Sequence, residues 1–145
     1  LADKKPLFLA VLNGSFVFAA DLMREITVPA EISFVKMSSY AGTSSTGKVK
    51  QLIGLNDDIK GRTIIIVEDI IESGLTMKAI LAQLAEKQPE AIHICTLLLK
   101  PDCLETELDI RYTAFEIPND FIVGYGLDYD QQGRNLKDIY TVVEE

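Results

Sequence analysis

The chain has few cysteines and no long apolar run, and these two features limit the classes of protein to which it can belong. Its 145 residues include two cysteines, Cys95 in an apolar run and Cys103 in a Pro-Asp-Cys turn. This usage argues against a disulfide framework and favours a reducing, cytoplasmic setting. No apolar stretch is long enough to cross a bilayer, and residues 1–6 lack the features of a signal peptide. A membrane is therefore not an expected partner.

Basic residues are scarce relative to acidic ones, with 14 Lys and Arg against 22 Asp and Glu and a net charge of −8. Proteins that bind nucleic acid through its phosphates need basic patches, so nucleic acid is not an expected partner. An anionic ligand would have to be held by backbone N–H groups, metal ions and a few placed cations. The chain also lacks a Gly-x-Gly-x-x-Gly motif after a strand, which disfavours a dinucleotide-binding oxidoreductase.

Hydrophobic patterning predicts strands that alternate with helices. Strands are expected at residues 7–12, 32–37, 63–67, 91–99, 121–125 and 139–143, with helices at residues 16–25 and between the third and fourth strands, ending near Lys87. The alternation predicts an α/β fold with a mostly parallel, twisted sheet flanked by helices. The length suits one domain, residues 1–145. Because the chain does not begin with Met, an N-terminal segment is expected to be missing.

Residues 38–50 differ from the rest because they are small and polar and show no periodicity. Unstructured loops of this length are usually functional lids or disordered segments. A plain hairpin tip remains the alternative for these residues.

Ligands of parallel α/β sheets bind at the carboxyl ends of the strands, near a topological switch point. The third strand is followed by the acids Glu68, Asp69 and Glu72 and then by residues 73–76, which begin a helix. A helix N-terminus offers unpaired N–H groups and a positive dipole end that suit a phosphate. A helix that is simply capped by Ser73, with acids favoured by its dipole, is the alternative. These residues alone leave both interpretations open.

Residues 67–76, Val-Glu-Asp-Ile-Ile-Glu-Ser-Gly-Leu-Thr, resemble the motif that binds 5-phosphoribosyl-1-pyrophosphate (PRPP) in type I phosphoribosyltransferases, and specifically in members acting on hypoxanthine and guanine. The likeness continues in family order and spacing at residues 11–15, 39–40, 45–47, 98–100, 115–118, 121–125 and 127–129. It implies the type I phosphoribosyltransferase fold, with a small hood and a flexible lid loop. It also implies Mg²⁺-dependent purine salvage, in which PRPP and hypoxanthine or guanine give IMP or GMP and pyrophosphate. A homodimer or homotetramer would be expected.

The resemblance implies a role for each matching residue around PRPP. Glu68 and Asp69 would hold the ribose hydroxyls, directly or through Mg²⁺. The 5′-phosphate would be wrapped by Glu72, Ser73, Gly74, Leu75 and Thr76. Pyrophosphate would be bound by Leu12, Asn13 and Gly14, in a loop that often contains a non-proline cis peptide, and by Arg134. Ser39 and Tyr40 would belong to the lid.

The same resemblance implies a purine site. Lys100 would donate to the purine O6, Phe121 would stack on the base, and the Ile122 backbone would contact its edge. Asp128 would hold a second Mg²⁺ beside the base. Glu72 would be the general base that takes a proton at N7. The alternatives are a solvated strand-end lysine for Lys100 and core packing for Phe121.

Three positions depart from the family pattern. Glu72 stands where the family has Asp, and Leu75 and Asn13 stand where some members have Lys. Glu72 leaves open a second hypothesis, a non-catalytic regulator that uses the same fold to sense PRPP or a nucleotide, whereas Lys100, Phe121 and Asp128 argue against it.

Overall fold

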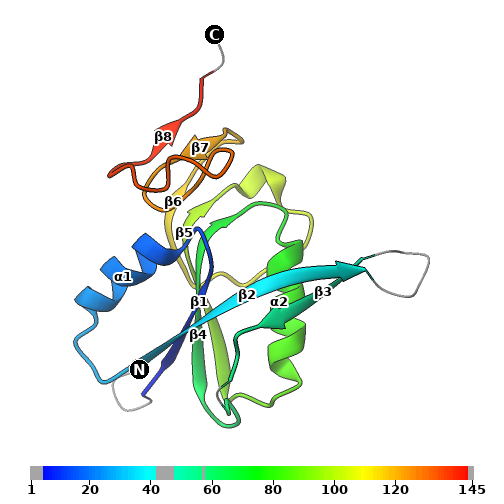
Figure 1. The fold of residues 1–145 in the computed structure, drawn as a ribbon. Helices are drawn as coiled ribbons and strands as arrows, with labels where there is room; N and C mark the ends of the chain where they lie inside the picture. Colours follow the sequence, from blue (N-terminus) through cyan, green and yellow to red (C-terminus); the bar gives the residue numbers. More distant parts are fainter. Residues whose placement is uncertain (1–4, 42–47, 57, 144–145) are drawn as a thin grey trace.

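The computed structural model describes residues 5–41, 48–56 and 58–143, and its main feature is a six-stranded sheet (Figure 1). The strands are β1 (Leu7–Val11), β2 (Glu31–Ala41), β3 (Lys48–Ile53), β4 (Thr63–Ile71), β5 (Ala91–Leu99) and β6 (Tyr112–Glu116), in the order β3-β2-β1-β4-β5-β6. All neighbours pair in parallel except β2 and β3, which form an antiparallel hairpin. The predicted α/β fold with a mostly parallel sheet is confirmed.

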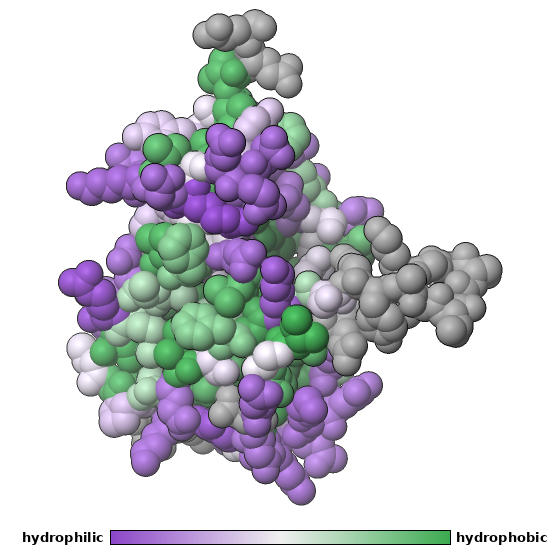
Figure 2. Space-filling model, viewed as in Figure 1, coloured by the Kyte–Doolittle hydropathy of each residue, from purple (hydrophilic) through white to green (hydrophobic). Residues whose placement is uncertain are grey.

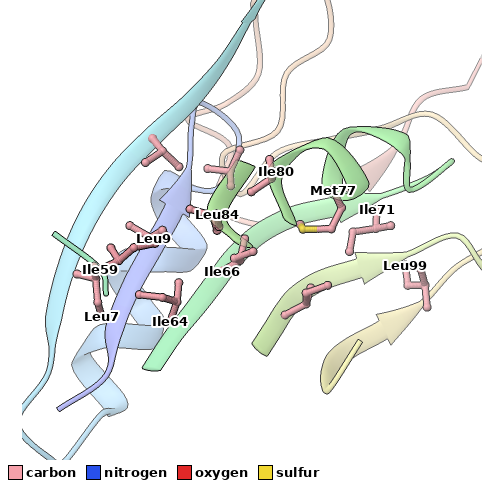
Figure 3. Close-up of a cluster of buried hydrophobic side chains, with 13 residues drawn as sticks. Leu7, Leu9, Ile59, Ile64, Ile66, Ile71, Met77, Ile80, Leu84 and Leu99 are labelled. Carbon is pink, nitrogen blue, oxygen red and sulfur yellow. The ribbon is translucent and has the colours of Figure 1, made fainter. Parts of the chain in front are cut away.

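Two helices cover opposite faces of the sheet: α1 (Phe16–Glu25) and α2 (Leu75–Ala85) (Figure 1). Alternate residues of β1 divide between the two faces, as the period of a strand requires. Leu7 and Leu9 pack with Met77 and Ile80 of α2 in the larger buried cluster, part of which Figure 3 shows. Phe8 packs in a second cluster with residues of α1. Burial of both faces explains why β1 is a continuous apolar run.

A small two-stranded hood stands above the carboxyl ends of the main strands (Figure 1). It contains β7 (Ile122–Val123) and β8 (Tyr140–Thr141), which pair in antiparallel fashion. Hydrophilic side chains gather over this part of the molecule, and hydrophobic ones over the face below it (Figure 2). Tyr125 connects the hood to α1, because its hydroxyl donates to Asp21.

The structure corrects several predicted boundaries. The strand expected to end at Val67 continues as β4 to Ile71, because Glu68 and Ile70 still pair with β5. The strands β3 and β6 and the 3₁₀ turn η1 (Pro101–Cys103) were not predicted, and β7 and β8 are shorter than expected. β2 reaches Ala41 and β3 begins at Lys48, so much of the segment 38–50 belongs to a hairpin rather than a loop. Residues 42–47 lie outside the described part.

Candidate active site

Two adjoining cavities lie at the carboxyl end of β4. The first, called here the β4–α2 cavity, is lined by Glu68, Ile70, Ile71, Glu72, Ser73, Gly74, Thr76 and Met77. The second, called here the hood cavity, is lined by Asp69, Ile70, Glu72, Lys100, Phe121, Ile122, Leu127 and Asp128. Ile70 and Glu72 line both. Glu68, Lys100 and Asp128, which were expected to lie near one another, therefore line two neighbouring cavities.

The β4–α2 cavity contains the start of a helix. Gly74 precedes α2 with a φ of 84°, a left-handed conformation that glycine adopts without strain, and no side chain caps the helix. The Ser73 hydroxyl accepts from the N–H of Leu75, the first residue of α2, at 3.3 Å, so the alternative of a helix start satisfied by Ser73 stays open. Thr76 and Met77 line the pocket, and the N–H groups of this first turn, with the positive dipole end, suit an anion.

The loop after β1 lies beside the acids of β4. The peptide bond between Leu12 and Asn13 is cis, as the resemblance implied. Ser15 fixes the next turn, because its hydroxyl donates to the Val11 carbonyl at 2.6 Å. A Cβ placed on Gly14 would overlap the Asp69 carboxylate. Any other residue at this position would have to displace the Asp69 side chain or the loop.

Glu68 and Asp69 occupy different environments although they are neighbours in β4. Glu68 is buried, and its carboxylate accepts from the Asp69 N–H at 3.1 Å. Burial, followed by the interaction with Asp69, raises the pKa of Glu68 well above its usual range. Asp69 is less buried, accepts from the Ile70 N–H at 2.8 Å and faces Gly14. Asp69 is thus the more accessible of the two carboxylates.

Lys100 and Glu72 form the central ion pair of the hood cavity. The Lys100 Nζ donates to Glu72 Oε2 at 3.0 Å and to Asn119 Oδ1 at 3.3 Å. The Lys100 side chain is 5% exposed, whereas that of Glu72 is 54% exposed. The alternative of a solvated strand-end lysine is therefore wrong: Lys100 is a buried ammonium aimed at a carboxylate inside a cavity.

The rest of the hood cavity comes from the segment between β6 and β8. The Phe121 side chain is 73% exposed, so core packing does not explain it. Asp128 accepts from the Gln131 N–H at 2.9 Å and pairs with Arg134 at 3.4 Å. Arg134 also donates to the Gly126 carbonyl at 2.9 Å. In this state Arg134 stabilises the hood loop and neutralises Asp128.

Sequence patterns identified most of these residues but missed Asn119. Its contact with Lys100 joins positions 19 residues apart, on different loops, and no local pattern indicates such a contact. Ser39 and Tyr40 lie in β2, opposite Lys50 and Val49 of β3, and their side chains lie outside the described part.

Within residues 5–41, 48–56 and 58–143, no group of three or more His, Cys, Asp or Glu side chains could hold a metal by itself. Mg²⁺ needs no such cage, since it commonly binds one or two carboxylates together with waters and substrate phosphates. Asp69, which is accessible beside Gly14, fits that pattern.

The cysteines and the lengths of the helices bear on the compartment and on membrane association. Cys95 and Cys103 are both free thiols. Among the described residues, no helix has the length and apolar character needed to span a bilayer.

Known proteins resemble this chain in both sequence and fold. Residues 1–130 match the phosphoribosyl transferase domain family. The chain is 47% identical over 137 residues to hypoxanthine-guanine phosphoribosyltransferase of Mycobacterium avium, covering 94% of this chain and 68% of that protein. It is 46% identical over 143 residues to hypoxanthine phosphoribosyltransferase of Buchnera aphidicola, covering 98% of this chain and 81% of that protein. A solved hypoxanthine-guanine phosphoribosyltransferase from Bacillus anthracis superposes with a TM-score of 0.83 at 42% identity, covering 95% of this chain and 82% of that one.

Proposed function

This chain belongs to the phosphoribosyltransferase family, and from that premise we propose that it transfers the 5-phosphoribosyl group of PRPP to a 6-oxopurine. Hypoxanthine and guanine are the proposed bases, and the products are IMP or GMP and pyrophosphate. Both relatives described above carry hypoxanthine in their names, and the Mycobacterium avium relative also carries guanine.

The ion pair of Lys100 with Glu72 is the observation that carries this proposal. Its ammonium and carboxylate lie 3.0 Å apart in the hood cavity, so a donor stands beside an acceptor. A 6-oxopurine presents O6, an acceptor, beside N7, where a proton can be given up. The Lys100 donor therefore matches O6, and the Glu72 acceptor matches the proton at N7. Adenine presents a 6-amino donor instead, which an ammonium cannot satisfy because it has donors only.

The reaction then divides among the residues around the two cavities. The bond between C1′ of the ribose and pyrophosphate breaks, and a purine nitrogen bonds to C1′. The base must lose a proton, and Glu72 takes it at N7 as general base. Lys100 holds O6, Phe121 stacks on the base, and the Ile122 backbone contacts its edge. The lid, with Ser39 and Tyr40, is proposed to exclude water from the cationic centre.

PRPP would extend from the hood cavity into the β4–α2 cavity. The 5′-phosphate would meet the backbone N–H groups of residues 73–76, supported by the start of α2 in the β4–α2 cavity. The cis-peptide loop of Leu12, Asn13 and Gly14 would bind pyrophosphate together with Arg134. Arg134 must first leave Asp128, with which it pairs at 3.4 Å.

Mg²⁺ is part of the proposal. Glu68 and Asp69 would serve one ion or the ribose hydroxyls, and Asp128 a second ion. Of these, Asp69 fits best because its carboxylate is accessible, whereas Glu68 is buried and its pKa is raised. When bound, Mg²⁺ would neutralise and orient the leaving pyrophosphate.

We also propose that the protein forms a homodimer or homotetramer and that it is located in the cytoplasm. Exposed aromatic side chains such as Phe16 and Phe34, 44% and 47% accessible, support an interface between copies. The two free thiols support a reducing compartment. Sedimentation analysis would test the oligomer.

A regulator that only senses PRPP is the second candidate function, and no observation favours it. Such a protein has no need of a buried lysine next to a proton acceptor, and this chain has both. The deciding experiment incubates the protein with PRPP, Mg²⁺ and hypoxanthine and measures IMP and pyrophosphate. Formation of both in equal amounts supports the transferase, whereas PRPP binding without turnover would support the regulator.

A further inference from the structure

The Lys100 ammonium is held from two sides by residues of separate loops. Glu72 approaches from the connection between β4 and α2, and Asn119 from the connection between β6 and β7. We propose that Asn119 is a positioning residue for the transferase reaction, which keeps the Lys100 ammonium at the purine O6 while Glu72 leaves it to accept the proton. This inference rests on the proposed function, since it assigns a task within that reaction.

A buried ammonium needs fixed acceptors. Lys100 is only 4% exposed, and an unpaired charge at such a position is costly. The ammonium has three N–H bonds. In the described part of the chain two of them are used, at 3.0 Å to Glu72 and 3.3 Å to Asn119. The third remains for the O6 of an incoming base.

Catalysis must disturb this arrangement. When Glu72 takes the proton at N7, its carboxylate becomes neutral and holds the Lys100 ammonium less strongly than the charged carboxylate that lies 3.0 Å away. Once Glu72 turns to N7, O6 and Asn119 are the acceptors left to Lys100. If Asn119 were absent, the ammonium would have Glu72 as its main protein partner, and the base would have to compete with that ion pair. Asn119 therefore lowers the free-energy cost of replacing Glu72 by O6 as a partner of the Lys100 ammonium.

The backbone around Asn119 is suited to hold its side chain in place. The Ile117 N–H donates to the Leu99 carbonyl at 2.8 Å, which joins the loop to the residue before Lys100. The Asp120 N–H donates to the Pro118 carbonyl at 2.9 Å, forming a tight turn around Asn119. Asn119 is thus placed by the backbone, whereas Glu72 is 54% exposed and can move.

Three variants test the proposal: Asn119→Ala removes the acceptor, Asn119→Asp keeps an oxygen in the same place, and Asp120→Ala is the control. The Asp120 side chain lies in the same turn, and no hydrogen bond or ion pair of it is seen within the described residues. Steady-state KM for hypoxanthine, KM for PRPP, kcat and the thermal midpoint are measured for each variant and the unaltered protein. A purely structural role would lower the thermal midpoint and change both KM values.

Asn119→Ala is expected to raise the KM for hypoxanthine by about tenfold or more, the effect of losing one hydrogen bond to a charged group. The KM for PRPP and the thermal midpoint should match those of Asp120→Ala. Asn119→Asp should recover a KM for hypoxanthine within about threefold of the unaltered protein, since O6 uses a different N–H of the ammonium.

Two results would overturn the inference while the unaltered protein makes IMP: Asn119→Ala behaving like Asp120→Ala, or Asn119→Asp being as impaired as Asn119→Ala. Absence of IMP formation by the unaltered protein would overturn the proposed function itself. The two failures are therefore distinguishable.

Discussion

Lys100 and Glu72 stand 28 positions apart in the chain, yet their charged atoms lie 3.0 Å from each other. The pair is asymmetric, because the lysine side chain is 5% exposed and the glutamate side chain 54%. The lysine cannot leave without losing its burial, whereas the glutamate can turn into solvent or toward a ligand. This asymmetry suits Lys100 to fix the base and Glu72 to exchange a proton.

Lys100→Ala tests the source of base preference. Without the ammonium, O6 of hypoxanthine loses its hydrogen-bond donor. The 6-amino group of adenine, itself a donor, no longer faces a second donor. An unmatched buried polar group costs about 1–3 kcal/mol, so the kcat/KM ratio of hypoxanthine to adenine should fall tenfold or more. Rates with each base separately provide the ratio. An unchanged preference would show that Lys100 does not read O6.

Substitutions of Glu72 test the identity of the general base. Glu72→Gln keeps the size of the side chain but cannot take a proton, so kcat should fall by roughly 10²–10⁴-fold. Glu72→Asp restores the shorter acid of the family and should preserve or raise kcat. PRPP KM should change little in both if the phosphate is held, as proposed, mainly by backbone N–H groups. Full kcat in Glu72→Gln would mean that the proton leaves by another route.

Gly14→Ala tests the close approach of the pyrophosphate loop to Asp69. The added Cβ would overlap the Asp69 carboxylate, so either the loop or the acid must move. A shift of about 1 Å in a catalytic site can cost roughly 10²-fold in rate, and kcat/KM for PRPP should fall on that scale. Gly61→Ala is the control, since a Cβ there meets nothing within 4 Å, although its φ of 73° adds some strain. Gly61→Ala should lower the stability of the fold without changing kcat/KM for PRPP. Equal PRPP kinetics in both variants would contradict the assignment of the loop.

Tyr125 provides a pH-dependent test of the contact between the hood and α1. Burial first, and then Asp21, raises its pKa from 10.0 to about 12. In the window between these values the unfolded chain has lost the tyrosine proton and the folded chain keeps it, so this contribution to stability falls as pH rises. Tyr125→Phe should remove that part of the pH dependence.

The ionisation itself can be followed by tyrosinate absorbance. The difference between the unaltered protein and Tyr125→Phe should show a midpoint near pH 12. Asp21→Asn should lower the midpoint only in part, because burial is the larger cause. A midpoint near 10 in the unaltered protein would show that Tyr125 is neither buried nor in contact with Asp21.

The sequence predicted the elements whose patterns are local. β1, β5 and α1 follow from apolar runs and helical spacing, and α1 has the predicted bounds, residues 16–25. β3 and β6 were missed because edge strands are not buried on both faces; Tyr112 and Phe115 of β6 are 43% and 59% exposed. The end of β4 was misplaced because acidic residues favour loops on average, and here pairing with β5 overrides that preference.

The candidate site was predicted mainly through family resemblance, and its unpredicted parts depend on contacts between distant segments. The ion pair of Arg134 with Asp128 requires the fold of the hood loop, and the contact of Asn119 with Lys100 requires the packing of that loop over β5. No spacing rule indicates either contact. The raised pKa of Glu68 likewise arises from burial within the completed sheet.

The most direct measurement of the central claim is a competition in one reaction. Limiting PRPP with Mg²⁺ is offered to the protein with equal amounts of hypoxanthine, guanine, xanthine and adenine, and the nucleotides formed are separated and quantified. IMP and GMP should dominate, with AMP at least about tenfold lower because Lys100 rejects the 6-amino group. AMP in amounts comparable to IMP, or no nucleotide from any base, would contradict the account.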